Sequence, residues 1–479
     1  MIKRATGATE QAWAALGGDP ALTAGIAYEG PAGTLPAVLP VRELARATVA
    51  VCALAAAELR TACDGGGRLP AVRVDDGALA TAFTSERQLR VDGRAVSAFA
   101  PLSRFWRSAD GWVRTHANYP HHRARLLAAL DVPDAGTSDT SDVEARVAAA
   151  LAELPAERAE EEIFAAGGLA VAVRTPREWA DHPQGAAAAR RPLLSVERIA
   201  GGPVRALSGI EALRVLDLTR VIAGPVAGRT LALLGADVLR VDPPRLPESE
   251  DAHADTGFGK RSTTLDLART ADRATFEALL ADADVVLSGY RPGALDRYGL
   301  SAQALAERRP GLVTVQLSAW GAYGPWGGRR GFDSLVQAAC GIAVTEAGSD
   351  GRPGVLPAQA LDHGTGYLLA AAVLRAVTEQ RTAGGTHVAR LALAQTAAWL
   401  TGGTVARDGG GDAPAYAAGE WLSERDSPLG RLRYALPPVA FDGGPRDWAR
   451  PPGRWGTDAP RWSQGLGSSA AGRRCRLRR

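Results

Sequence analysis

The stretch Leu213–Asp242, LRVLDLTRVIAGPVAGRTLALLGADVLRVD, decides the fold class of this chain. The apolar run Leu213–Leu218 predicts a buried strand, and Leu239–Asp242 predicts the next one. Between them we expect a helix that begins just after Ala223-Gly224-Pro225, because proline suits the first helical position, and that ends at Gly235. A strand, a helix and a strand in this order predict a right-handed crossover and a parallel sheet.

Ligands of such sheets bind outside the carboxyl ends of the strands. This rule places Arg220–Ala223 at the mouth of a candidate site. The same unit also serves as plain scaffolding, and the stretch by itself favours that interpretation over a specific site. Other parts of the sequence have to decide between the two.

Composition limits the classes of protein that come into question. The 479 residues are enough for more than one domain, and 55 basic against 52 acidic residues give a net charge of +3. This balance gives no reason to expect nucleic acid, and we interpret the basic run Arg473–Arg479 as a disordered tail. The four cysteines form no metal-binding or disulfide pattern, which predicts free thiols in a reducing cytoplasm. We expect no signal peptide and no membrane span, because the longest apolar stretch, Val49–Leu59, is too short to cross a bilayer and predicts a buried helix.

Two parts of the chain resemble each other. Leu44–Phe83 and Thr365–Leu400 both show an Ala-rich apolar helix, an Arg-Thr end, a glycine turn, a short strand and a second apolar helix. We interpret them as an internal repeat, and shared alanine-rich composition is the alternative. When the Arg-Thr ends are aligned, Val41 stands opposite Asp362, so only the second copy has a carboxylate at this point.

Further motifs follow the quoted stretch in a fixed order. They are Gly259-Lys260-Arg261-Ser262 before a strand at Thr263–Leu267, Asp284–Leu287 before Tyr290–Gly299, Ser318–Pro325 before Arg330–Asp333, and Leu361–Gly366 at the start of a long apolar helix. Together with Val215–Pro225 and Leu234–Val238, this order resembles the family III CoA-transferases. That family includes formyl-CoA transferase, carnitine CoA-transferase and the 2-methylacyl-CoA racemases.

The resemblance implies an α/β fold, with a Rossmann-like parallel sheet in the large domain and a smaller α+β second domain. Asp110–Val113 and Ala165–Gln184 resemble elements that lie late in the usual family chain, although they come first here. We therefore expect residues 1–205 to be a degenerate late-type segment with small-domain elements, and residues 206–400 to be the catalytic segment that binds CoA. Residues 401–479 are expected to be loop-rich. Paired glycines and a proline near residues 201–203 favour the first boundary.

The resemblance implies that Asp362 is a catalytic nucleophile. Its carboxylate would attack an acyl-CoA thioester to form an acyl-aspartyl anhydride, CoA would convert this to an aspartyl-CoA thioester, and an acceptor carboxylate would complete the exchange. A helix N-terminus favours the negative charge that develops, and Gly364 and Gly366 would let backbone N–H groups approach the reacting carbonyl. The alternative for Asp362 is an ordinary helix N-cap.

Coenzyme A, as substrate and product, is expected to contact residues in the turns that follow the strands. By resemblance these are Val221, Ile222, Ala223, Lys260, Tyr290, Arg297, Tyr298, Ser318, Ala319 and Trp320. Arg297 is the best single phosphate ligand, because a guanidinium grips phosphate at two points, and an ion pair with Asp296 is the alternative. Lys260 is a weaker candidate, since GFGKRS lacks the pattern of a P-loop. The family's sequence pattern contains a glycine in the next loop, and residues Ser318–Trp320 of this chain depart from it.

Phe332 separates the branches of the family. Racemases place a histidine after the glycine of a Gly-x-Asp element, whereas this chain has Gly331-Phe332-Asp333, so the resemblance favours transfer over proton abstraction. His363 is a possible substitute base, but it should point away from Asp362. The histidines of residues 116–123, HANYPHHR, lack further ligands at metal-binding spacing and favour a substrate-facing loop or plain surface.

We therefore expect a cytoplasmic CoA-transferase that acts on an acyl-CoA and a free carboxylic acid, without metal, nucleic acid or membrane. The resemblance implies an intertwined homodimer, and the internal repeat leaves a pseudo-dimeric monomer as an alternative. A 2-methylacyl-CoA racemase and a non-catalytic CoA-binding protein are the competing functions.

Overall fold

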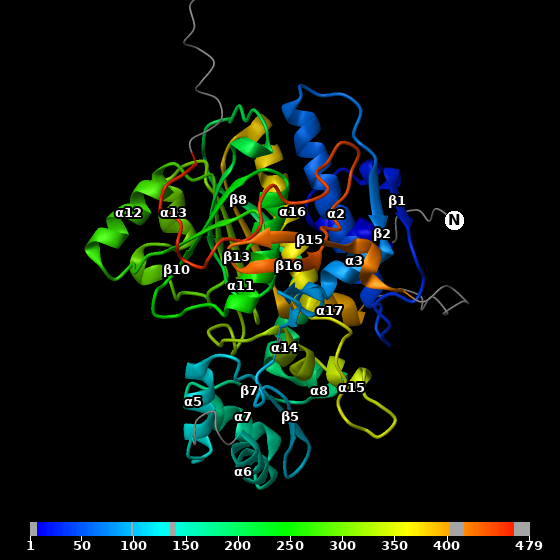
Figure 1. Cartoon of the computed structure of the whole chain (residues 1–479), viewed down its shortest axis with the longest axis vertical. Coiled ribbons are helices and arrows are strands. Elements are labelled where there is room, and N and C mark those ends of the chain that lie inside the picture. Colours follow the sequence, from blue (N-terminus) through cyan, green and yellow to red (C-terminus); the bar gives the residue numbers. More distant parts are fainter. Residues whose placement is uncertain (1–6, 97–98, 135–139, 403–415, 464–479) are drawn as a thin grey trace, which may run out of the picture.

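The computed structural model describes residues 7–96, 99–134, 140–402 and 416–463. A seven-stranded sheet lies at its centre (Figure 1), in the order β11, β10, β9, β12, β13, β14, β8. The first six strands are parallel and β8 is antiparallel to β14. The strands are β8 (Leu194–Ala200), β9 (Arg214–Leu218), β10 (Asp237–Asp242), β11 (Arg261–Thr264), β12 (Val285–Ser288), β13 (Val313–Ser318) and β14 (Thr386–Ala392).

Helices cover both faces of this sheet. They are α10 (Ala223–Leu233), α11 (Glu250–Thr256), α12 (Thr270–Ala281), α13 (Ala302–Arg308), α14 (Asp333–Ala339), α15 (Ile342–Thr345), α16 (Ala360–Ala383) and α17 (Leu393–Gly402), with short 3₁₀ turns η2 (Ile210–Ala212) and η3 (Asp296–Tyr298). Val215 packs into the core that contains α10 and α16, whereas Leu216 packs with α12 and α13 on the other face. Burial on both faces explains why Val215, Leu216 and Leu218 of β9 are all apolar.

The quoted stretch folds as predicted, with one shift. β9, α10 and β10 follow one another and the strands pair in parallel, which confirms the predicted unit. Gly235 lies beyond the end of α10 with φ 108°, a conformation that glycine adopts without strain. The helix begins at Ala223, so Pro225 is its third residue rather than its first.

The two copies of the suspected repeat have the same local structure. The first forms α2 (Val41–Cys63), β2 (Val72–Asp75) and α3 (Asp76–Phe83), and the second forms α16, β14 and α17. The order of helix, strand and helix predicted for both is confirmed, as is burial of Val49–Leu59 inside α2. The two long helices pack along each other (Figure 1), but β2 pairs with β1 (Ile26–Glu29) and not with the large sheet.

A smaller unit lies at the bottom of Figure 1 and has its own hydrophobic cluster. It consists of β5 (Phe105–Arg107), β6 (Trp112–Thr115), β7 (Ala170–Ala172), α5 (Pro120–Ala129), α6 (Thr140–Ala152) and α7 (Ala156–Ala165). Val113 and Ile163 are among its fully buried side chains. The strands predicted around Asp110–Val113 and within Ala165–Gln184 belong to this unit as β6 and β7.

The remaining elements connect these parts. They are α1 (Gly7–Ala15), η1 (Pro20–Gly25), α4 (Ser85–Gln88), β3 (Arg90–Val91), β4 (Arg94–Ala95), α8 (Pro176–Asp181), α9 (Pro183–Ala189), η4 (Ala418–Trp421), β15 (Leu422–Ser427) and β16 (Gly430–Ala435). β16 pairs with β3, so the C-terminal hairpin completes a small sheet with the N-terminal part of the chain. Of the segment 401–479, which is expected to be loop-rich, residues 403–415 and 464–479 lie outside the described residues, and the latter include the basic tail at Arg473–Arg479.

The structure bears on two predictions, one about the cysteines and one about membrane-spanning helices. Cys52, Cys63 and Cys340 are free thiols, while Cys475 lies outside the described residues. Within the part of the chain that is described, no helix is both long and apolar enough to span a membrane.

Candidate active site

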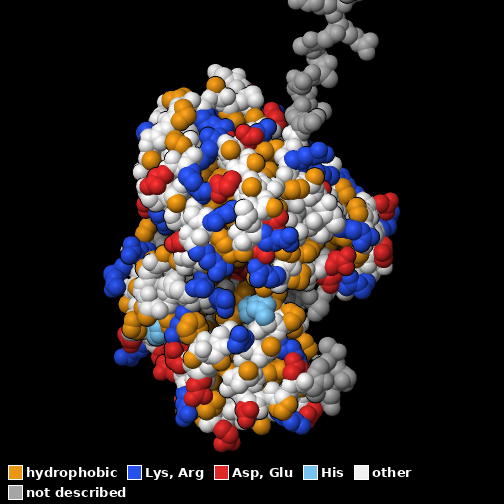
Figure 2. All heavy atoms as spheres, turned by 90° about the vertical axis from the view of Figure 1, so that its left-hand side faces the viewer, with side chains coloured by type: hydrophobic (Ala, Val, Ile, Leu, Met, Phe, Trp, Pro, Cys, Tyr) orange, Lys and Arg blue, Asp and Glu red, His pale blue; other side chains and the backbone are white. Residues whose placement is uncertain are grey.

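A cavity of about 460 Å³ contains Asp362 in its wall, and we call it the nucleophile cavity. Its lining comes from the N-terminus of α16, the turn after β9, the segment around α11, the start of α14, and residues 86–120 of the N-terminal part. The lining residues used below are Glu86, Val96, Phe99, His116, Asn118, Tyr119, Val221, Ile222, Glu248, Asp251, Asp255, Phe332, Asp333 and Asp362. Figure 2 shows a recess between the large upper part and the small lower part of the molecule, bordered by Lys or Arg and histidine side chains.

Asp362 is the third residue of α16, and Gln359 occupies the N-cap position. The N-cap alternative for Asp362 is therefore wrong. The residue is 6% exposed, and its backbone N–H donates a 2.9 Å hydrogen bond to the Asp333 carboxylate. Burial raises the pKa of Asp362 well above its usual range, and the negative charges of Asp333 and Glu86 raise it further.

Asp333 begins α14 and is fully enclosed by protein. Burial raises its pKa to about 6, although the N–H of Asp362 and the side-chain amide of Gln337 donate hydrogen bonds that oppose the rise. Gln337 in turn accepts a 2.9 Å hydrogen bond from the N–H of Leu356, which fixes its orientation. The pair Asp333 and Asp362 thus shares one desolvated pocket, the arrangement in which two carboxyl groups resist ionising together.

His363 faces away from the nucleophile cavity, as predicted for a neighbour at a helix start. It is buried completely, stacks on Phe83 at a ring distance of 5.3 Å, and lies 3.2 Å from a Glu86 oxygen. Burial raises the pKa of Glu86, but the contact with His363 outweighs it and the net pKa is lowered. His363 does not line the cavity, which weakens its case as a base.

The turn after β9 carries backbone strain at the cavity wall. Val221 has φ 73°, a left-handed conformation that costs a β-branched residue roughly 1–3 kcal/mol. Its N–H donates a 3.2 Å hydrogen bond to Glu248. Val221 and Ile222 line the cavity as the sequence predicted for residues at this mouth, whereas Ala223 is buried in the first turn of α10 and does not.

Glu248 connects the sheet with the smaller unit. Its carboxylate accepts a 2.8 Å hydrogen bond from the Tyr119 hydroxyl and pairs with Arg240 at 3.3 Å and with Arg220 at 3.7 Å. Burial raises its pKa, but the two arginines outweigh this and hold the pKa below its ordinary value. These contacts hold the Glu248 carboxylate in a fixed position beside the cavity.

Of the three histidines in the HANYPHHR stretch, His116 lines the nucleophile cavity, and a substrate-facing role for this loop stays a prediction. His116 stacks on Phe332 with ring centres 3.7 Å apart and planes at 3°. His121 and His122 lie against each other nearby. Burial, together with His122 and Arg114, lowers the pKa of His116 well below its usual value, so the imidazole is neutral. Among the described residues no group of three metal-ligating side chains is found.

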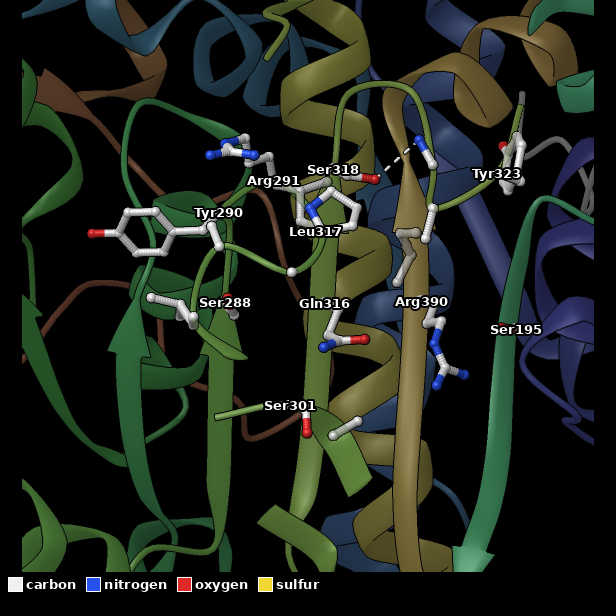
Figure 3. Close-up of a pocket in the computed structure, with 18 of the residues that line it drawn as sticks. Ser195, Ser288, Tyr290, Arg291, Ser301, Gln316, Leu317, Ser318, Tyr323 and Arg390 are labelled. Atoms are coloured by element: carbon white, nitrogen blue, oxygen red, sulfur yellow. Dashed lines mark hydrogen bonds between the residues drawn. The ribbon is translucent and has the colours of Figure 1, made fainter. Parts of the chain in front are cut away.

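A second cavity of about 670 Å³ is lined by residues of β12, β13, β14 and the edge strand β8, and we call it the strand-end cavity (Figure 3). Ser288, Gln316 and Arg390 project into it from neighbouring strands. Two predicted CoA ligands are here. Tyr290 lines this cavity, and its ring turns away from Arg390 in Figure 3; Ser318 lines it too and accepts a 3.0 Å hydrogen bond from the N–H of Gly321.

The prediction that Lys260 contacts phosphate needs correction. Its ammonium is 3.0 Å from the buried Asp217 carboxylate and donates to the carbonyl of Pro225 at 3.2 Å. The side chain is 1% exposed and reaches neither cavity. Lys260 is an internal ion pair that connects β9 with the loop before β11.

Arg297 and Tyr298 form a surface stack instead of lining a cavity. The Arg297 guanidinium lies 4.7 Å from the Tyr298 ring centre, and Arg273 lies 5.8 Å from the same ring. The ion pair with Asp296 that we considered for Arg297 does not form. Neither predicted ligand touches a described cavity.

Ala319 and Trp320 belong to the core rather than to a cavity wall. Trp320 is 2% exposed, and its indole N–H donates a 3.2 Å hydrogen bond to the Arg330 carbonyl. The Ala319 carbonyl accepts a 2.9 Å hydrogen bond from the N–H of Ala394. Neither residue lines the two cavities described here, and their contacts with CoA stay a prediction.

Gly364 and Gly366 lie inside α16, and packing alone accounts for them. A Cβ on Gly364 would come within 2.6 Å of Leu44 in α2, and one on Gly366 would come within 2.6 Å of the Ala223 carbonyl and 2.8 Å of Val226 in α10. Neither glycine lines the nucleophile cavity. Their catalytic role stays a prediction, and their small size is what lets α16 approach both neighbours.

Three arginines, Arg220, Arg291 and Arg330, come into question in place of the predicted cations. Arg220 contacts Glu248, and burial together with the charges of Arg330 and Arg220 lowers the pKa of His121. Burial and the charge of Arg291 likewise lower the pKa of Arg330. Arg291 also lines the strand-end cavity, and we refer to Arg220, Arg291 and Arg330 together as the cationic rim. The sequence had already placed Arg220 at the mouth of a candidate site, and Arg291 and Arg330 lie within the motifs of the resemblance, although none of the three was predicted to bind phosphate.

The first copy of the repeat offers a comparison for Asp362. The Arg-Thr alignment puts Val41 opposite it, but counting from the helix starts puts Glu43 at the equivalent third position. The Glu43 carboxylate forms an ion pair with the Arg46 guanidinium at 2.7 Å, and Arg46 also donates a hydrogen bond to Asp76. Of these two acids, only Asp362 lacks a cationic partner and lines the cavity, which agrees with one nucleophile per chain.

The family follows from a comparison with known sequences. The model described as CoA-transferase family III matches residues 207–424, which include Asp362 and the turn after β9. This segment belongs to CoA-transferase family III. The family III segment thus contains the large sheet except β8, whereas residues 86–120 of the cavity wall precede it.

Curated relatives agree with this assignment. "Probable fatty acyl-CoA transferase Rv3272" of Mycobacterium tuberculosis is 36% identical over 41% of this chain and 53% of its own length. "Acetyl-coenzyme A transferase nodX" of Hypoxylon pulicicidum is 32% identical over 49% and 38%, and "Succinate--glutarate CoA-transferase" of Agrobacterium fabrum is 33% identical over 38% and 50%. The chain therefore spans about half or less of these relatives. A crystal structure of Rv3272 is 35% identical over 40% of this chain and 54% of that one, with a TM-score of 0.38.

Proposed function

We propose that this protein is a CoA-transferase in which Asp362 accepts the acyl group. The observation that carries the proposal is a buried carboxylate without a cationic partner in the wall of a cavity that also contains Val221 and Ile222. Membership of residues 207–424 in CoA-transferase family III supports it. The substrates are an acyl-CoA and a free carboxylic acid, with coenzyme A as substrate and product.

The proposed reaction consists of four consecutive acyl transfers. The Asp362 carboxylate attacks the thioester carbonyl, the C–S bond breaks, and CoA leaves as a thiolate. The thiolate attacks the aspartyl carbonyl of the resulting anhydride, which releases the donor acid and forms an aspartyl-CoA thioester. The acceptor carboxylate then displaces the thiolate to give a new anhydride. The thiolate finally attacks the acceptor carbonyl, forms the new acyl-CoA and returns the Asp362 carboxylate.

The environment of Asp362 suits this role. Only the ionised carboxylate is a nucleophile, and a desolvated carboxylate with a raised pKa is more reactive than a solvated one. The N-terminal end of α16 favours the charge that develops on the reacting carbonyl oxygen. Asp333 holds the backbone of Asp362 in place.

CoA contacts are proposed from the positions described above. Val221 and Ile222 contact the pantetheine near Asp362, and the rim of Arg220, Arg291 and Arg330 takes the phosphates in place of Lys260 and Arg297. Tyr290 lies along the nucleotide, and Ser318 lies farther along the strand ends in the strand-end cavity.

Several finer expectations are part of the proposal. The large sheet is Rossmann-like and the unit of β5–β7 is the second domain. The protein is cytoplasmic. The pseudo-dimeric monomer is favoured over the intertwined homodimer, because residues 86–120 and Asp362 wall one cavity within a single chain.

Mass spectrometry tests the nucleophile. The protein is incubated with a panel of acyl-CoAs and trapped with hydroxylamine, and peptides are mapped. A hydroxamate confined to Asp362, in a sample that exchanges CoA between labelled acids, supports the proposal. Full exchange with Asp362 unmodified and replaceable by asparagine would contradict it.

A second candidate function is proton abstraction by His116. This neutral imidazole stacks on Phe332, the position at which the resemblance expects a racemase base, and lines the same cavity as Asp362. The protein would then act as a 2-methylacyl-CoA racemase. Deuterium entering the α carbon in D₂O without acyl exchange supports this function, and loss of that exchange in His116→Phe identifies the base.

A further inference from the structure

The walls of the nucleophile cavity carry one sign of charge. Six of the described lining residues are acids: Glu86, Glu248, Asp251, Asp255, Asp333 and Asp362. No described lining residue is a lysine or an arginine. Cations that pair with these acids stand behind them, as Arg94 does for Asp251 at 2.7 Å and Arg229 does for Asp255 at 3.2 Å. A ligand inside the cavity therefore meets carboxylates without a facing positive charge.

The rest of the lining is apolar and partly flat. Val96, Phe99 and Ile222 contribute hydrocarbon surface, and the parallel stack of Phe332 on His116 adds two rings. His116 is uncharged, because burial above all lowers its pKa well below the usual value. An acyl group with an apolar skeleton would find dispersion contacts here at no cost in desolvated charge.

Arg114 is the cation that needs separate consideration. It is 6% exposed, and its guanidinium packs 5.3 Å from the Phe99 ring centre and 4.9 Å from that of Phe105. Its Nε has no hydrogen-bond partner among the described residues. Phe99 lines the cavity and Arg114 does not, so the aromatic ring is what a ligand would contact.

On the basis of the transferase activity proposed above, we propose that the nucleophile cavity selects uncharged acyl groups with an aromatic or branched apolar skeleton and rejects those that carry a second carboxylate. Asp362 reacts with the thioester carbonyl while the skeleton lies against Val96, Phe99 and Phe332. A second carboxylate would be buried among like charges, which costs several kcal/mol in comparable interfaces and corresponds to at least about 100-fold in selectivity.

Benzoyl-CoA and succinyl-CoA are the probes for a direct test. The full chain is assayed for transfer from each thioester to labelled acetate, and kcat/KM is expected to be at least about 100-fold higher for benzoyl-CoA. Equal use of the two, or preference for succinyl-CoA, overturns the inference while the proposed transferase function stands.

A second test introduces a positive charge into the wall of the nucleophile cavity by substitution. Phe99→Arg is expected to reduce the preference for benzoyl-CoA by about 10-fold or more, because it offers a partner to the second carboxylate. Val344→Arg is the matched control, since Val344 is 37% exposed, close to the 36% of Phe99, and lies outside the cavity. An unchanged ratio in Phe99→Arg, with the fold intact by circular dichroism, counts against the inference. Arg114→Leu adds a check: a selective loss of succinyl-CoA use would show that Arg114 anchors a carboxylate and would overturn it.

Binding separates the two proposals if no thioester turns over. Calorimetry with benzoyl-CoA and succinyl-CoA then measures selectivity without chemistry. Tighter binding of benzoyl-CoA supports the cavity inference although the transferase function fails. Equal Kd values, or tighter binding of succinyl-CoA, overturn the inference.

Discussion

The backbone N–H of Asp362 donates a 2.9 Å hydrogen bond to the carboxylate of Asp333, and both carboxyl groups are buried in one cavity wall. Asp333 therefore does two opposing things. It fixes the first turn of α16, and its negative charge contributes to the raised pKa of Asp362, after burial. The site thus holds Asp362, the proposed nucleophile, in place while making its ionisation costly.

Replacing Asp362 by asparagine is expected to lower kcat by about 10³-fold or more, because the amide cannot form the acyl-enzyme. The substitution removes a buried, unpaired carboxyl group, so the free energy of unfolding at neutral pH should stay equal or increase. Rates of CoA exchange and urea unfolding measure the two effects. Asp64→Asn, at an exposed acid beyond α2, is the control and should change neither.

The Asp333→Asn variant should shift the pH dependence of activity. The asparagine oxygen still accepts the Asp362 N–H, but its negative charge is gone, so the pKa of Asp362 falls. Because the proposed nucleophile is the ionised Asp362, the acidic limb of kcat/KM should move to lower pH. A kcat/KM profile recorded from about pH 4 to about pH 9 measures this shift, because that interval covers the usual range of shifted carboxyl pKa values. A limb that moves to higher pH, or stays in place, would show that Asp333 does not control the nucleophile.

Lys260→Met should destabilise the fold rather than weaken CoA binding. Removing the ammonium leaves Asp217 buried and unpaired, which costs about 3–5 kcal/mol. The double variant Asp217→Asn/Lys260→Met should recover much of this loss, since no charge is then buried. Urea unfolding of both variants gives the free energies, and calorimetry with CoA gives the affinity. A large loss of CoA affinity in the stable double variant would show that Lys260 does contribute to CoA binding.

Gly366→Ala should cost about 1–3 kcal/mol in stability, because its Cβ would meet the backbone carbonyl of Ala223, which cannot move freely. Gly364→Ala should cost less, since its Cβ would meet the flexible end of Leu44. Gly419→Ala, which has open space, serves as the control. Thermal unfolding ranks the three variants, and a catalytic role for either glycine would appear as a loss of kcat larger than the loss of folded protein.

Mixing two inactive variants tests whether the site forms within one chain. Asp362→Asn and His116→Asp each damage the same cavity, one from α16 and one from the N-terminal wall. In a pseudo-dimeric monomer, co-expression of the two should restore no activity above the sum of each alone. Restoration toward a quarter to a half of wild-type activity would show that partner chains exchange walls, as in an intertwined dimer; light scattering reports the mass in parallel.

The sequence by itself determined the strand–helix–strand unit of residues 213–242, the paired helix–strand–helix segments and the position of Asp362 at the start of a long helix. These features depend on local patterns: apolar runs, glycine at helix ends and the order of motifs. It also placed Val221 and Ile222 at a ligand mouth, because the carboxyl ends of parallel strands meet at one edge.

Only the tertiary structure decided which charged groups face the site. Lys260 and Arg297 have the right chemistry for phosphate, but one is buried against Asp217 and the other lies on Tyr298. His116 comes from a segment far from Asp362 in sequence and reaches the same cavity. Side-chain partners depend on contacts between distant segments, and these arise from packing of the whole core, which no local pattern encodes.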